Sequence, residues 1–124
     1  MVMALAAALV PLAALGQTRT EQRLPDIVAV KVRAAGPDTF DFDVTVSSPY
    51  DTPARCADAF RVSSLDGAVL GERKLLHDHQ GEQPFTRDLH GVKVARHIKT
   101  VVVQGRDQKF GYGGKTVQVQ LPGR

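Results

Sequence analysis

The sequence predicts an all-β fold, an antiparallel sandwich built from seven short strands. Two observations predict it. Apolar residues beyond residue 26 recur with a period of two rather than 3.6, which is the period of a strand with one buried face. Turn-forming residues then divide this pattern into short runs with no convincing helix between them. A small β-barrel is the alternative architecture for such a pattern.

The clearest expected strand is residues 40–47, where Phe40, Phe42, Val44 and Val46 alternate with polar residues. The turn at residues 35–38 joins it to the run before it as a hairpin. In chain order, the expected strands are residues 28–33, 40–47, 60–63, 69–76, 85–89, 98–104 and 116–121.

The remaining connections carry turn signals of their own. Asp66-Gly67 predicts a hairpin between the third and fourth strands. His90-Gly91 is expected to end the fifth strand, and residues 106–114 are expected to form a glycine-rich loop. Strand lengths and the Asp-Gly hairpin favour a fibronectin type III or immunoglobulin-like sandwich, although the Cys-Trp-Cys pattern of immunoglobulin domains is absent.

The first sixteen residues contain no charge and end in small residues, the pattern of a signal peptide cleaved after Gly16. No basic residue precedes the apolar run, so either the true start lies upstream of Met1 or the amino terminus supplies the charge. A buried N-terminal helix is the alternative interpretation. The expected organisation is a signal peptide at 1–16, a lead-in at 17–26 and a sandwich at 27–121, with the mature protein periplasmic or secreted and without a membrane span.

Composition narrows the possible partners. The net charge is +3, from 16 basic and 13 acidic side chains that are scattered along the chain. Nucleic-acid binders concentrate basic residues on one face, so we expect no nucleic acid partner. The only cysteine is Cys56, which excludes an intrachain disulfide, and no cysteine follows the apolar run of residues 1–16, so we expect no lipid anchor.

The stretch from residue 57 to residue 121 resembles a group of small secreted bacterial proteins of uncharacterised activity. The residues that carry this likeness are Asp66-Gly67, His77-Asp78-His79, the run from Glu82 to Arg87 and the run from Gly111 to Thr116. The resemblance implies a small exported domain. It implies no activity and assigns no functional residue.

One end of the predicted sandwich gathers the unusual residues. In this strand order, the connections between strands two and three, four and five, and six and seven lie at the same end, where loops on a rigid scaffold often carry recognition. The candidate binding residues on them are Tyr50, Arg55, Glu82, Arg106, Asp107, Phe110 and Tyr112. The leading hypothesis is a non-enzymatic binding or accessory module without a cofactor, which contacts a protein or glycan.

A metal site is the alternative hypothesis. His77 and His79 stand two residues apart, so in an extended segment both imidazoles point the same way, and neutral imidazole suits copper, zinc or nickel. Glu82, Asp107 or Cys56 could supply a third ligand. Cys56 also follows Arg55, whose charge could lower the thiol pKa, whereas a small buried residue is the alternative reading of this cysteine. An enzyme using Cys56 or a metal-bound water is the least favoured class.

Overall fold

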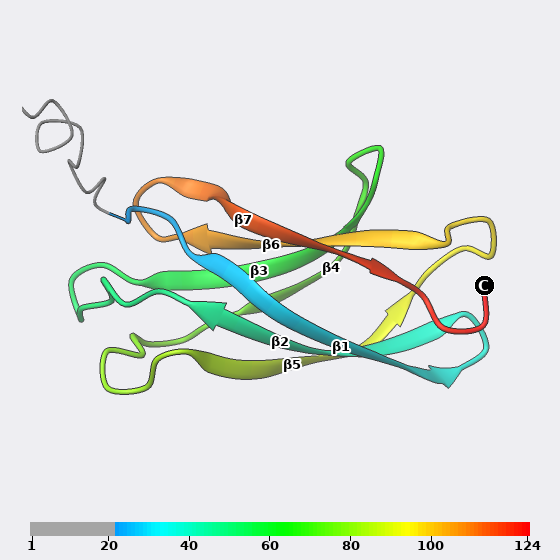
Figure 1. The fold of residues 1–124 in the computed structure, drawn as a ribbon, viewed down its shortest axis with the longest axis horizontal. Helices are drawn as coiled ribbons and strands as arrows, with labels where there is room; N and C mark the ends of the chain where they lie inside the picture. The colour runs from blue at the N-terminus through cyan, green and yellow to red at the C-terminus, as the bar shows by residue number, and fades with distance from the viewer. Residues whose placement is uncertain (1–21) are drawn as a thin grey trace, which may run out of the picture.

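Two antiparallel sheets pack face to face in the computed structural model, which describes residues 22–124 (Figure 1). The predicted signal peptide lies outside the described residues. The strands are β1 (Asp26–Gly36), β2 (Thr39–Ser47), β3 (Ala57–Ser64), β4 (Val69–Lys74), β5 (Phe85–Lys93), β6 (Thr100–Asp107) and β7 (Gly111–Gln120). One sheet has the order β1-β2-β5 and the other β4-β3-β6-β7. The sandwich prediction is confirmed, and the barrel alternative is wrong because the strands form two separate sheets.

No helix within residues 22–124 is long and apolar enough to cross a membrane. The core lies between the sheets and is built mainly from valine and phenylalanine. β2 shows why the period-two pattern was informative: it pairs with β1 on one side and β5 on the other, and Phe40, Phe42, Val44 and Val46 are each at most 4% exposed. Each such buried side chain contributes about 1.5–3 kcal/mol through loss of contact with water.

β1 departs from the expected alternation. Val28 is 51% exposed, whereas Ile27 is buried, because the register of β1 against β2 shifts between Ile27 and Ala29. A β-bulge inserts one residue into a strand and so reverses which side chains face the core on one side of it. Val30 and Val32, beyond the bulge, pack against the core as their pattern predicts.

The expected end of β5 at His90-Gly91 is also wrong. The strand continues to Lys93, and the register against β2 shifts between Phe40 and Phe42, so the two residues are accommodated within the ladder. Gly91 has a φ of +68°, which glycine adopts at no steric cost. Its backbone N–H donates to Asp41 Oδ1 at 2.8 Å, which compensates for the interrupted ladder.

The glycine-rich loop expected at residues 106–114 is mostly strand. β6 runs to Asp107 and β7 begins at Gly111, so only residues 108–110 form the turn. The glycines are needed for close approach instead. A Cβ on Gly105 would lie 2.8 Å from Pro25 Cγ, and one on Gly113 would lie 2.5 Å from Leu24 Cδ1. The segment that leads into β1 therefore crosses directly over β6 and β7.

Candidate functional site

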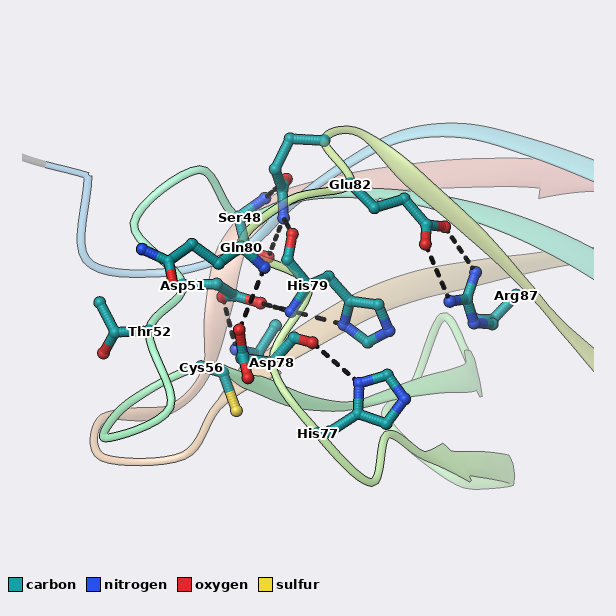
Figure 2. A network of polar contacts seen from close by, with 12 residues as sticks. Ser48, Asp51, Thr52, Cys56, His77, Asp78, His79, Gln80, Glu82 and Arg87 are labelled. Carbon is teal, nitrogen blue, oxygen red and sulfur yellow. Dashed lines mark hydrogen bonds and ion pairs between the residues drawn. The ribbon is translucent and has the colours of Figure 1, made fainter.

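The three connections that sequence analysis placed at one end do meet there (Figure 1). We call this region the loop end: residues 48–56, residues 75–84 and residues 108–110. The Asp51 carboxylate joins the first two segments and is 1% exposed. Its Oδ1 accepts a hydrogen bond from the Ala57 backbone at 3.0 Å, and its Oδ2 accepts one from the His79 backbone at 3.0 Å (Figure 2).

Gln83 adds a second connection between the same two segments. Its Oε1 accepts from the Ser48 backbone N–H at 2.7 Å, and its Nε2 donates to the His79 carbonyl at 3.0 Å and to Ser48 Oγ at 3.2 Å. Every polar group of this side chain is used within the fold. In the loop at residues 75–84, side-chain hydrogen bonds from Asp51 and Gln83 therefore add to the backbone bonds of Leu75 and Glu82.

Asp107 holds the turn at residues 108–110 against the first segment. Its side chain is fully buried, and Oδ2 accepts from the backbones of Lys109 and Phe110, each at 2.9 Å, and from Arg55 Nε at 3.2 Å. Burial alone would raise the pKa of Asp107, but these hydrogen bonds and the Tyr50 hydroxyl outweigh it and lower the pKa below its usual value of 3.8. This predicted binding residue is consequently a structural anion inside the loop end.

A cluster of one exposed aromatic ring and three cations lies at the loop end, with Arg23 contributed by the segment before β1. The Arg55 guanidinium carbon lies 4.4 Å from the Tyr50 ring centroid and 4.7 Å from that of Phe110, so it sits between the two rings. Lys109 Nζ and the Arg23 guanidinium carbon lie 5.4 and 5.8 Å from the Phe110 centroid. Phe110 is 46% exposed. We call Arg23, Arg55, Lys109 and Phe110 the Phe110 patch.

The two imidazoles of the predicted metal site differ sharply in environment. Their ring centroids are 4.9 Å apart, and His77 is exposed with Nδ1 2.8 Å from the Asp78 carbonyl (Figure 2). His79 is 5% exposed and stacks on Phe85 with 3.8 Å between centroids. Its Nδ1 lies 3.9 Å from Asp51 Oδ2 without a hydrogen bond. Burial is the main reason that the pKa of His79 falls below 6.5.

Two of the three proposed third ligands, Glu82 and Asp107, are already engaged. Glu82 pairs with Arg87 at 3.0 Å, and Asp107 is committed to the turn and to Arg55. Among residues 22–124, no group of three His, Cys, Asp or Glu side chains is placed to hold a metal ion. The metal site at His77 and His79 stays a prediction, and it would require His79 to leave its stack on Phe85.

The thiol of Cys56 is not activated by its neighbour Arg55. Cys56 is 8% exposed, and burial, followed by the carboxylates around it with Asp51 foremost, raises the pKa of the thiol. The Arg55 guanidinium is directed to Asp107 and Tyr50 instead. The possibility of a lowered thiol pKa is contradicted, and the interpretation of Cys56 as a small buried residue agrees with the structure.

Two predicted binding residues lie elsewhere, because β6 and β7 extend through the expected loop. Arg106 and Tyr112 stand on the outer face of the four-stranded sheet, in register with each other. Arg106 pairs with Asp58, and the Tyr112 hydroxyl donates to Glu72 Oε2 at 2.6 Å. Sequence analysis did not identify Asp58 and Glu72, because an isolated acidic residue on a strand has the same pattern as an ordinary solvent-exposed charge.

One comparison with known proteins gives a relative. The chain is 38% identical over 97 residues to a protein of Halomicrobium mukohataei named "Putative lipoprotein". The match covers 78% of this chain and 47% of the relative, so the chain spans about half the length of the relative. No protein-family model matches the chain. No solved structure matches it either.

Proposed function

We propose that this chain is an exported, non-enzymatic binding or accessory domain that works at the cell envelope and contacts a protein or glycan through its loop end. Two observations support the envelope location: the uncharged apolar run at residues 1–16, and the similarity to a protein named as a lipoprotein. The strand order β1-β2-β5 and β4-β3-β6-β7 supports assignment to the fibronectin type III-like sandwiches, whose loops commonly carry recognition.

The observation that carries the proposal is the Phe110 patch on a rigid frame. Aromatic rings and arginine contribute most to binding energy at protein interfaces. Here Arg55 is stacked between Tyr50 and Phe110 and is anchored by the buried Asp107, so its orientation is set before any partner arrives. A preorganised patch loses little conformational entropy on binding, which favours affinity.

Site-directed photo-crosslinking in the native host tests this role. A photoreactive amino acid replaces Phe110 in the full chain, and the matched control carries it at Leu65, which is 61% exposed near the opposite end of the sandwich. We expect discrete envelope adducts from position 110 and none from position 65. The same adducts from both positions, or none from position 110, would refute the loop end as the contact surface.

The second candidate is a periplasmic protein that binds copper, zinc or nickel through His77 and His79. The 4.9 Å separation of the two ring centroids favours it, whereas the burial of His79 disfavours it. Calorimetric titration of the full chain with Cu(II), Zn(II) and Ni(II) separates the outcomes. One-to-one binding that His77→Ala abolishes would support a metal site, and binding that this substitution leaves unchanged would exclude it.

A further inference from the structure

A hollow of about 510 Å³ lies on the outer face of the four-stranded sheet, beside the loop end. The hollow forms because a small side chain lies between two long side chains on neighbouring strands. Ala59 on β3 is in register with Lys74 on β4 and with Arg106 on β6, so a methyl group stands between two long cations. The hollow falls within the size range typical of small-molecule sites.

The polar rim of the hollow carries two negative and two positive side chains, and not all of them are paired with one another. Asp58 and Glu72 provide two carboxylates, whereas Lys74 and Arg106 provide two cations. Arg106 pairs with Asp58 Oδ2, which leaves Oδ1 buried and without a hydrogen-bond partner among the described residues. The Asp58 side chain is 26% exposed, so the carboxylate is partly accessible from the hollow while it holds Arg106.

The Glu72 carboxylate is held by a residue outside the hollow. Tyr112 donates to Oε2, and the Arg61 guanidinium carbon lies 3.7 Å from the centroid of the same tyrosine ring, which fixes the ring in place. Lys74 forms no ion pair with any residue in the 22–124 range. The rim therefore presents donors and acceptors together, held by the Arg106–Asp58 pair within it and by Tyr112 from outside.

One side of the hollow is apolar. Leu76 is 91% exposed beside it, and the amide of Gln108 completes the rim on the side of the loop end. An exposed leucine next to a polar hollow can pack against the C–H face of a ring, while the rim groups bind the hydroxyls at the edge of that ring.

The chemistry of the rim selects the ligand class by elimination. Asp58 and Glu72 would repel a simple anion, and Lys74 and Arg106 would repel a simple cation. A group that both donates and accepts hydrogen bonds, as a hydroxyl does, can use both kinds of rim residue. We propose that this hollow binds one sugar ring of a neutral glycan. This proposal rests on the proposed binding function. It specifies a glycan as the ligand, bound on the outer face of the four-stranded sheet.

The test is a titration of the ¹⁵N-labelled full chain with glucose, galactose, mannose and N-acetylglucosamine at millimolar concentrations, followed by NMR. Glycerol serves as the control, because it carries hydroxyls without a ring. We expect saturable shifts of the Ala59, Leu76 and Gln108 amides with at least one sugar and none with glycerol. Absence of saturable shifts at these amides, or equal shifts with glycerol, would overturn the proposal.

Two pairs of variants locate the effect. Glu72→Gln and Lys74→Ala each remove one rim charge and should weaken sugar binding roughly tenfold, the effect of losing one charged hydrogen bond. Asp66→Asn and Lys93→Ala remove exposed charges elsewhere and should leave binding unchanged. If all four variants bind equally, the hollow is not the site. Photo-crosslinking from position 110 reports separately on the loop end, so the two proposals can fail independently.

Discussion

The two ends of the sandwich are held together by opposite chemistry. At the loop end, the buried carboxylates of Asp51 and Asp107 accept hydrogen bonds from backbone N–H groups of neighbouring loops. At the other end, the Arg124 side chain is 9% exposed and donates to the carbonyls of Val94 and Ile98 and to Asp38 Oδ1. In both places buried charged side chains organise loops that lie beyond the strand ladders: Asp51 and Asp107 at one end, and Arg124 at the other.

The comparison changes how the charged residues at the loop end are interpreted. Asp107 and His79 were candidates for binding or metal chemistry, and both are buried: Asp107 accepts hydrogen bonds from the turn at residues 108–110, and His79 stacks on Phe85. The Phe110 patch differs from these two residues in its exposure. Phe110 is half exposed, and Arg55 is held beside its ring. A charged loop residue is thus informative about function only once its internal partners are known.

The largest expected effect at the loop end is that of Asp107→Ala. The substitution leaves Arg55 without its partner and frees two backbone donors, so we expect the free energy of unfolding to fall by about 3 kcal/mol. Urea denaturation measures it. Asp107→Asn keeps one acceptor and should cost less. A loss below about 1 kcal/mol for Asp107→Ala would show that Asp107 does not organise the turn.

Arg124→Ala should lower the free energy of unfolding by about 2 kcal/mol, because the carbonyls of Val94 and Ile98 and the Asp38 carboxylate lose a charged donor. The control is Arg96→Ala: Arg96 also pairs with Asp38, but its side chain is 86% exposed, so we expect no measurable change. Equal effects of the two substitutions in urea denaturation would mean that the burial of Arg124 contributes nothing.

The pH dependence of stability should contain a contribution from His79 at the loop end. Because burial lowers its pKa in the folded state below 6.5, the unfolded chain binds more protons as the pH falls. This contribution is present above pH 6.5 and is lost as the pH falls towards the folded pKa. NMR titration of the imidazole measures that pKa, and a value above 6.5 would contradict the stacked, buried geometry.

His90, on the exposed face of the three-stranded sheet, should act in the opposite direction. Hydrogen bonds to Asp41 and then Asp88 raise its pKa above 6.5, with Nε2 2.7 Å from Asp88 Oδ2. The stabilisation is complete below pH 6.5 and is lost as the pH rises through the folded pKa. His90→Gln should remove this part of the pH dependence while that of His79 persists. An unchanged profile would place His90 outside the ion pairs.

The smallest effect is expected for Phe110→Ala, at most about 0.5 kcal/mol, because the ring is half exposed and its loss leaves Asp107 and the turn intact. Thermal denaturation checks this. A large loss of stability would mean that Phe110 belongs to the loop framework, and the patch would no longer support a binding role.

The sequence by itself determined the fold class, the number of strands and the end at which the three loops meet. Those features depend on local patterns: the alternation of residues 40–47 and the turn signals between runs. It did not determine strand ends at bulges, as Val28 and Gly91 show, because a one-residue shift depends on the partner strand.

Only the tertiary structure decided the roles of individual side chains. The sequence neighbour of Cys56 is Arg55, but contacts made across the fold direct that arginine to Asp107 and leave the thiol buried among carboxylates. Arg106 and Tyr112 were expected in a glycine-rich loop but lie on a sheet face for a similar reason. The glycines around them allow residues 24–25 to cross closely over β6 and β7, and they do not form a loop. Burial and pairing between distant residues decide which polar groups remain free, and no local pattern encodes them.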